Sequence, residues 1–258
     1  MARPGVEREY RWLLPDQEGW ATMADFLLAA PPPAGCAPGG SRTAMQGNIY
    51  FDSPDHRLAA AGISLSLILG TTPEHTWLVC KKRLAVSRSG RHDALEVGCR
   101  TCRRHLPASF SRCTLTPVRY LRHLGLAHSW SQYAVSRQER HKVTIQMPGD
   151  QQLYASFDRV RTWPVTPGSH PTLADDGETT PVSSRWLEIE SNGSSGPALI
   201  RLDQWAARIT EASGRTPSRI SKSQYASETA GRGDSLDEYG SASWSQAQRP
   251  GGKEATGS

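Results

Sequence analysis

The sequence predicts an α+β protein whose core is an antiparallel β-barrel or sandwich, with helices at its periphery. Three observations lead to this class. About eight segments alternate apolar with polar residues or are rich in β-branched and aromatic residues. Clusters of Pro, Gly, Asp and Ser separate these segments, and helical patterns are few. With 258 residues, the chain can bury one sizeable core, so a single main domain is expected.

The first half of the chain alternates strands with turns and contains one helix. We expect strands at residues 6–14, 48–51, 62–68, 76–81 and 94–97, a helix from Pro15–Glu18 through Leu27, and a loop at residues 31–47. The helix is expected because apolar side chains recur at helical spacing after a proline. The loop is expected because its residues are rich in Pro and Gly. Asp52–Asp55 should form a turn that ends the second strand.

The second half of the chain continues this pattern and ends in a helix. We expect helices at residues 116–124 and 197–213, strands at residues 133–147, 153–160 and 186–190, and a surface loop at residues 163–184. Pro117 suits the first turn of a helix. Pro148–Asp150 separates two strands that should pair as a hairpin. The last helix has apolar side chains at helical spacing, which include Leu202, Trp205 and Ile209.

The charge is unevenly distributed between a folded part and a tail. Residues 1–226 are predicted to form one domain, whereas residues 227–258 are rich in Ser and Gly and are predicted to be disordered. The chain carries a formal charge of +5, and the tail has three basic and five acidic residues, so the domain carries +7. Such a surplus suits an anionic partner, either a phosphorylated small molecule or a nucleic acid.

Several features predict a soluble protein of the cytoplasm that does not enter a membrane. No segment approaches the roughly 20 apolar residues of a transmembrane helix. Carboxylates at Glu7 and Glu9 occupy the place where a secretory signal would have its apolar stretch. The five cysteines are an odd number in a chain large enough to fold without disulfides, which favours reduced thiols.

Charged residues on the predicted strands recur at every second position. Glu7 with Glu9, and Glu188 with Glu190, would each place two carboxylates on one strand face. Basic residues alternate in the same way at Lys81, Arg140 and Lys142. If the strands closed with these faces inward, the carboxylates could hold a divalent cation such as Mg²⁺ and the basic groups could hold phosphates. The alternative is that these residues form the solvated outer face of half-buried strands.

Several motifs, taken together and in order, resemble the CYTH or triphosphate tunnel metalloenzyme superfamily. Glu7-x-Glu9-x-Arg11 is similar to its N-terminal Glu-x-Glu-x-Lys, with Arg in the place of Lys. The further matches are Tyr50-Phe51-Asp52-Ser53-Pro54-Asp55, Ala61-Gly62-Ile63-Ser64-Leu65, Trp77-Leu78-Val79-Cys80-Lys81, Ala155-Ser156-Phe157-Asp158, Glu188-x-Glu190 and Pro217-x-x-x-Ser221-Lys222. The resemblance covers roughly residues 6–226, and six weak matches in the same order, with residues 50–55 and 61–65 counted as one, are more specific than any one alone.

The resemblance implies an eight-stranded antiparallel β-barrel that forms a tunnel and binds Mg²⁺ or Mn²⁺ together with a small-molecule triphosphate or polyphosphate, rather than a nucleic acid. The implied metal ligands are Glu7, Glu9, Asp158, Glu188 and Glu190, of which the four glutamates would also position the attacking water. The implied phosphate-binding residues are Arg11, Lys81, Arg140, Lys142 and Lys222. The implied activity is hydrolysis of an inorganic, organic or nucleoside triphosphate. The alternatives are a non-catalytic polyphosphate or nucleotide sensor and a class IV-like adenylate cyclase.

The chain departs from the family pattern on two strands. Leu65-Ser66-Leu67-Ile68 stands where the family has Leu-Arg-x-Arg, so two phosphate-binding arginines are absent. The family's Arg-x-Glu-x-Glu strand is matched only loosely by residues 91–96. Counted from Arg91, Glu96 would point away from the barrel interior unless a β-bulge intervenes. Without a bulge, Asp93 would be the inward acid. We therefore expect a less basic barrel wall, and with it either a substrate other than plain inorganic triphosphate or catalysis that is weakened or lost while ligand binding persists.

Other site types have less support in the sequence. Cys99-x-x-Cys102, with His105 and Cys113 nearby, could be a zinc site, although the second ligand pair is irregular and reduced thiols are the simpler interpretation. The histidines have no sequence context of a catalytic triad and should be surface or supporting residues. No phosphate-binding P-loop or dinucleotide-binding glycine motif is present in the sequence.

Overall fold

The computed structural model describes most of the chain up to residue 229. The described ranges are residues 5–14, 20–70, 76–101, 113–126, 129–149, 151–165, 180–191 and 196–229. The strands are β1 (Gly5–Leu14), β2 (Ala37–Asp52), β3 (Ile63–Leu69), β4 (Thr76–Val86), β5 (His92–Arg100), β6 (Ser131–Gln146), β7 (Gln152–Pro164) and β8 (Val182–Ser191). The helices are α1 (Met23–Ala29), α2 (Arg57–Ala60), α3 (Thr116–His123), α4 (Gly196–Ser213) and α5 (Lys222–Thr229).

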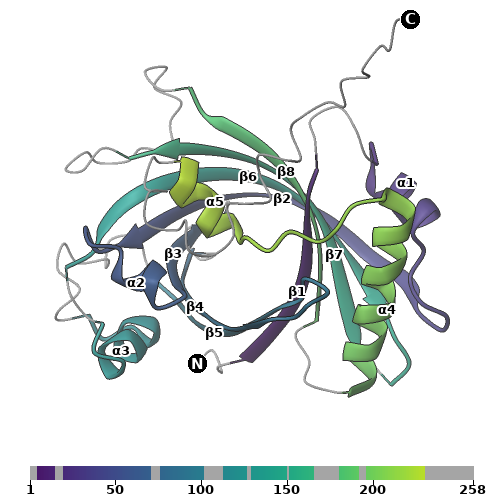
Figure 1. Cartoon of the computed structure of the whole chain (residues 1–258), viewed down its shortest axis with the longest axis horizontal. Coiled ribbons are helices and arrows are strands. Elements are labelled where there is room, and N and C mark those ends of the chain that lie inside the picture. Colours follow the sequence, from purple (N-terminus) through teal and green to yellow (C-terminus); the bar gives the residue numbers. More distant parts are fainter. Residues whose placement is uncertain are drawn as a thin grey trace, which may run out of the picture.

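The strands form a closed antiparallel barrel in the order β1-β5-β4-β3-β2-β6-β7-β8. Figure 1 looks along the barrel, whose strands form a ring, with α4 outside it and α5 across its opening. The predicted eight-stranded barrel with peripheral helices is therefore confirmed. The predicted strands at residues 6–14, 62–68 and 76–81 correspond to β1, β3 and β4.

The apolar residues of the strands face outward, where helices cover them. Tyr10 and Trp12 of β1 pack with Leu202 and Trp205 of α4 in one buried cluster that also includes α1. A second cluster joins the outer faces of β2, β3 and β4 to α2 and α3. Because strand residues alternate in direction, burying the apolar faces under helices turns the charged faces into the barrel.

The prediction of a loop at residues 31–47 was wrong for most of its length. β2 begins at Ala37 and pairs with β6 from Ala37↔Gln146 to Asp52↔Ser131, with a register shift between Pro38 and Ser41. The long partner strand supplies a ladder of hydrogen bonds that outweighs the poor strand propensity of Pro and Gly. The bulge accommodates that sequence near the strand's start.

The first helix begins later than predicted, and a short helix was missed. Thr22 and Asp25 form a capping box, so α1 starts at Met23, after the non-helical Trp20–Thr22, and Pro15–Glu18 of the predicted helix lie outside the described residues. Asp52 is buried, and its carboxylate accepts hydrogen bonds from the backbone N–H groups of Leu58 and Ala59. The motif that predicted a turn after β2 therefore also fixes α2.

The later segments differ from the prediction mainly at their boundaries. Trp163 and Pro164 complete β7, and Val182–Ser184 belong to β8, so the predicted 163–184 loop was wrong at both ends, and residues 166–179 lie outside the described residues. α5 extends to Thr229, three residues beyond the predicted domain end at residue 226. The rest of the predicted disordered tail lies outside the described residues.

α4 is the longest helix of the described residues and is amphipathic. Its 18 residues bury Leu202, Trp205 and Ile209 against the barrel, whereas Ile200 is exposed. Within the ranges that the structure describes, no helix is long and apolar enough to cross a membrane.

Gly90 provides a test of how the chain after α4 closes against the barrel. Gly90 has φ +87°, and a Cβ added there would lie 2.8 Å from Cβ of Pro217. Gly125 has a similar φ of +72° with nothing within 4 Å of such a Cβ. Both alanine variants should carry the strain of a left-handed backbone. Gly90→Ala should lower the free energy of unfolding by about 2 kcal/mol more than Gly125→Ala, because the segment at Pro217 must also shift to avoid the new Cβ.

Urea denaturation of both variants would measure this difference. Equal losses in the two variants would show that Pro217 does not pack firmly on the turn at Gly90.

Candidate functional site

The strand register turns the predicted charged residues toward one another inside the barrel. On β1 and β8, Glu9 lies opposite Glu190 and Arg11 lies opposite Glu188. On β6 and β7, Arg140 lies opposite Asp158. Directly opposite residues share a sheet face. These residues are buried or largely buried, and their apolar neighbours pack under the helices on the opposite face, so the alternative of a solvated outer face is excluded.

Three of the carboxylates gather closely enough to hold a metal ion. Glu7, Glu9 and Glu190 each offer an oxygen within 4.8 Å of the others. All three side chains are largely buried. Carboxylate oxygens are donors that suit Mg²⁺ or Mn²⁺. The donor set therefore fits the cation that the motifs implied.

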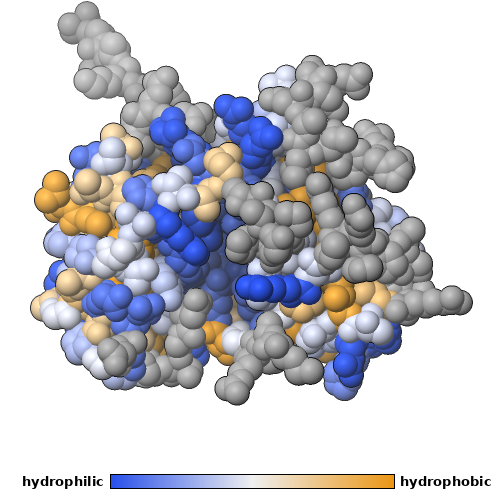
Figure 2. Space-filling view, turned by 180° about the vertical axis from the view of Figure 1, so that it is seen from behind, coloured by the Kyte–Doolittle hydropathy of each residue, from blue (hydrophilic) through white to orange (hydrophobic). Residues whose placement is uncertain are grey.

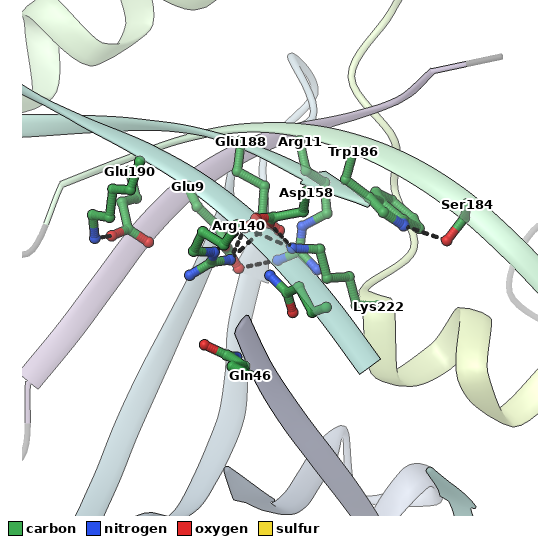
Figure 3. Close-up of polar contacts among 12 residues, drawn as sticks. Glu9, Arg11, Gln46, Arg140, Asp158, Ser184, Trp186, Glu188, Glu190 and Lys222 are labelled. Carbon is green, nitrogen blue, oxygen red and sulfur yellow. Dashed lines mark hydrogen bonds and ion pairs between the residues drawn. The ribbon is translucent and has the colours of Figure 1, made fainter. Parts of the chain in front are cut away.

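The other two predicted metal ligands lie among cations. Arg140 donates two hydrogen bonds of 2.8 Å to the two carboxylate oxygens of Asp158 and a third, also 2.8 Å, to Glu188. Lys222 donates to Asp158 and lies 3.0 Å from Oε2 of Glu188. Figure 3 shows Arg140 and Lys222 pointing at these two carboxylates from different elements. In this arrangement Asp158 holds cations rather than completing the group of Glu7, Glu9 and Glu190.

The remaining predicted phosphate-binding residues each contact a glutamate. Nζ of Lys81 lies 2.5 Å from Glu7 and 3.2 Å from Glu96, and Nζ of Lys142 lies 2.5 Å from Glu190. Arg11 donates to Glu9. The Nε of Arg11 is buried and has no hydrogen-bond partner in the described part of the chain, so it remains able to donate to a ligand.

Burial and neighbouring charges set the proton affinities in this interior. Burial raises the pKa of Glu7 to about 8, and Glu9 and Glu190 add to this effect while Lys81 opposes it. Burial also acts to raise the pKa of Asp158, but Arg140 and Lys222 outweigh it and hold that pKa well below its usual range. A further positive charge beside Glu7, such as a metal ion, would favour its ionised form.

The segment between α4 and α5 carries Lys222 into the barrel. Ser218 donates its backbone N–H to the carbonyl of Arg11 at 2.7 Å, and its own carbonyl lies 2.8 Å from Nε2 of His92. Tyr225 of α5 then contacts the ring of Trp186 edge-on. In Figure 1, α5 lies across the barrel opening. The closing Ser-Lys motif thus depends on backbone bonds to β1 and a side-chain bond to β5.

Sequence reasoning misassigned the inward residues of β5. The register pairs Glu7 with Ala94 and Lys81 with Glu96, so Glu96 faces inward, whereas Asp93 faces outward and binds Arg91 at 2.9 Å. The expected parity was wrong because the family's arginine was matched to Arg91. The alternation of His92 with Glu96 was the available signal for the correct inner face. His92 is buried, and burial with the charge of Arg11 lowers its pKa to about 4.

Arg42 was also missed, because its segment was predicted to be a loop. It lies opposite Lys142 on the inner face of β2 and is exposed. The prediction of a missing basic wall on β3 is consistent with the structure, since Ser66 and Ile68 face inward, opposite Tyr50 and Asn48 of β2.

The zinc hypothesis remains a prediction. Cys102 and His105 lie outside the described residues. Cys99 and Cys113 have free thiols and pack in the apolar cluster beneath α3. Cys80 faces away from the interior, opposite in direction to Lys81, and burial raises its pKa to about 12.

Comparison with known proteins identifies the fold. No protein-family model and no curated protein matches the sequence. An adenylate cyclase candidate from Bacillus halodurans superposes with a TM-score of 0.53 at 13% identity, covering 86% of this chain and 97% of that chain. An adenylyl cyclase candidate from Hippeastrum, described as having a dominant triphosphatase activity, gives 0.52 at 15% identity, covering 86% and 95%. The chain has a CYTH-like fold, as its motifs predicted.

Replacing Asp158 should show how strongly the interior depends on paired charges. Asp158→Asn leaves Arg140 and Lys222 with one carboxylate fewer, so we expect a loss of about 3 kcal/mol in the free energy of unfolding at pH 7. Because the native pKa of Asp158 is lowered, its stabilisation is present above the unfolded pKa of about 4 and is lost as the pH falls toward the native value.

The difference between wild type and variant should therefore shrink below about pH 4. Denaturation curves between pH 3 and pH 8 would measure it. A difference that stayed constant over this range would contradict the assigned role of Asp158.

Proposed function

We propose that this protein hydrolyses a triphosphate compound in a metal-dependent reaction inside the barrel, in the cytoplasm. The observation that carries the proposal is the meeting of an acidic group with five cationic side chains on one inner surface. The acidic group is Glu7, Glu9 and Glu190, and the cationic residues are Arg11, Lys81, Arg140, Lys142 and Lys222. The triphosphatase activity described for the Hippeastrum protein of the same fold supports it.

The ion pairs in the interior suggest how a ligand would be bound. Mg²⁺ or Mn²⁺, held by Glu7, Glu9 and Glu190, would neutralise phosphate charge and activate a water molecule. Lys81, which contacts Glu7, and Lys142, which contacts Glu190, would then move their ammonium groups from these glutamates to phosphate oxygens. Asp158 would keep Arg140 and Lys222 oriented toward the substrate. Phosphoryl transfer needs chiefly such positioning and charge neutralisation.

In the proposed reaction, water attacks the terminal phosphorus in line with its bridging oxygen. The bond between that phosphorus and the bridging oxygen breaks, which yields orthophosphate and a diphosphate. Glu188 lies opposite Arg11 and near Arg140 and Lys222, where it can accept the proton of the attacking water. Arg11 and Lys222 can stabilise the charge on the departing oxygen.

A second candidate function is binding without turnover. It is favoured by the inward Ser66 and Ile68, which give β3 no cation to grip a phosphate. A sensor of this kind would be stabilised against heat by tripolyphosphate without releasing phosphate.

Phosphate release from tripolyphosphate, ATP and thiamine triphosphate with Mg²⁺ or Mn²⁺ would test hydrolysis, and cyclic AMP measured in the ATP samples would reveal cyclisation. Glu190→Gln should lower kcat at least about a hundredfold, because the metal loses a charged ligand. The matched control is Glu139→Gln on the exposed outer face of β6. This control should change kcat less than about twofold.

Thermal midpoints of both variants would show that they are folded. Equal turnover in Glu190→Gln and wild type would contradict the role of Glu190 as a metal ligand in the proposed reaction. Stabilisation by tripolyphosphate with no turnover would favour the sensor.

A further inference from the structure

One part of the barrel interior has no role in the proposed hydrolysis. It is an uncharged surface on β2, β3 and β6, hereafter the neutral wall, formed by Gln46, Asn48, Tyr50, Ser64, Ser66, Ile68, Ser136 and Gln138. Gln138 is two residues from Arg140 on β6, so their Cα atoms lie about 7 Å apart along the strand. In Figure 3, Gln46 lies on the opposite side of Arg140 from Glu188.

The side chains of this wall form a directed chain of hydrogen bonds. Nε2 of Gln46 donates to Oδ1 of Asn48 at 3.2 Å. Nδ2 of Asn48 then donates to the hydroxyl of Ser136 at 3.2 Å and to Oε1 of Gln138 at 3.5 Å. Because Asn48 uses its oxygen toward Gln46, its amide must present nitrogen to Gln138, and this fixes the orientation of the Gln138 amide.

The chain of hydrogen bonds ends at the side-chain N–H group of Gln138, which has no acceptor in the described part of the structure. Gln138 is 2% exposed, so this donor is buried. A buried donor without a partner costs about 1–3 kcal/mol, so a ligand that supplied an acceptor there would recover that free energy. The donor is on the same strand face as Arg140, the residue proposed to bind phosphate.

The chemistry of the neutral wall does not suit another phosphate. Its residues carry no charge, whereas the opposite strands β1 and β8 carry Glu7, Glu9, Arg11 and Glu188. A group with hydrogen-bond donors and acceptors but no charge would satisfy Gln138 and could exchange bonds with Asn48. Tyr50 and Ile68 add an aromatic ring and an apolar side chain beside these amides.

We infer that the neutral wall is a subsite for the uncharged organic group of an organic triphosphate, with Gln138 and Asn48 as its recognition residues. A nucleobase is the chemical class that fits, because Asn and Gln amides pair with base edges that present a donor beside an acceptor. This inference rests on the proposed function, since it assumes that the phosphates occupy the charged part of the interior. It assigns the specificity of the site to residues of β2 and β6, and β2 pairs directly with β3, the strand on which Ser66 and Ile68 replace the two arginines expected from the resemblance.

The test compares nucleoside triphosphates with tripolyphosphate. Calorimetric titration with Mg²⁺ gives Kd for ATP, GTP, CTP, UTP and tripolyphosphate, and kcat/KM gives the same comparison where turnover occurs. Wild type should favour at least one nucleotide over tripolyphosphate by about tenfold or more, the value of one satisfied buried hydrogen bond. Gln138→Met keeps the side-chain length but removes the amide, so it should lower this ratio about tenfold.

The matched control is Gln152→Met, which makes the same chemical change at the exposed start of β7 and should leave the ratio unchanged. Asn48→Ala is the second variant if Gln138→Met fails to fold, and it should lower the ratio in the same direction. An unchanged ratio in the Gln138 variant would overturn the inference, and so would an equal loss of affinity for nucleotides and tripolyphosphate.

The test also separates this inference from the proposed function. If wild type binds tripolyphosphate as tightly as every nucleotide, the recognition subsite fails while triphosphate binding stands. If wild type binds none of these compounds, the proposed function fails first.

Discussion

The structure depends on the mutual neutralisation of charges that a closed barrel buries. Moving a carboxylate or an ammonium group out of water costs several kcal/mol, so each charge inside the barrel needs a partner of opposite sign. Arg140 and Lys222 satisfy this need for Asp158 and Glu188, which lie on neighbouring strands. Lys222 comes from the C-terminal segment, so the same ion pairs also hold α5 at the barrel opening.

The same need for neutralisation means that the charged side chains could exchange their internal ion pairs for contacts with a metal ion and phosphates. A protein that buried these charges only for stability would do as well or better with apolar residues of similar volume. Here Glu7 keeps a raised pKa despite its contact with Lys81, because burial raises it and the nearby Glu9 and Glu190 add to that effect. A metal ion at the carboxylates and phosphates at the cations would relieve both sets of like charges together. In the proposed function, the cationic side chains would occupy the place of the metal ion beside the carboxylates, and the carboxylates the place of the phosphates beside the cations.

The sequence predicted most inward charges through alternation along single strands, and it predicted the closed eight-stranded barrel through the resemblance of its motifs to a known family. It failed where the partner strand decides the outcome. The poor strand propensity of Pro38 and Gly39 hid the first half of β2, which exists only through its ladder with β6, and with it Arg42. Likewise the inward direction of Glu96 is fixed by its pairing with Lys81, and the local signal for it, the alternation of His92 with Glu96, was overlooked because the motif was aligned on Arg91.

The division of the interior into a charged part and a neutral wall limits what the site can bind. An inorganic triphosphate is anionic along its whole length, so cations on every side would serve it best. In this barrel the five cations of the site point at carboxylates of β1, β7 and β8, and Arg42 of β2 is exposed. Ser66, Ile68 and Gln138, by contrast, line the neutral wall. A ligand with a charged end and an uncharged, hydrogen-bonding end matches both parts. If the proposed function holds, Ser66 and Ile68 in place of two arginines would change what the barrel recognises, while Glu7, Glu9 and Glu190 would still form an acidic group able to hold a metal ion.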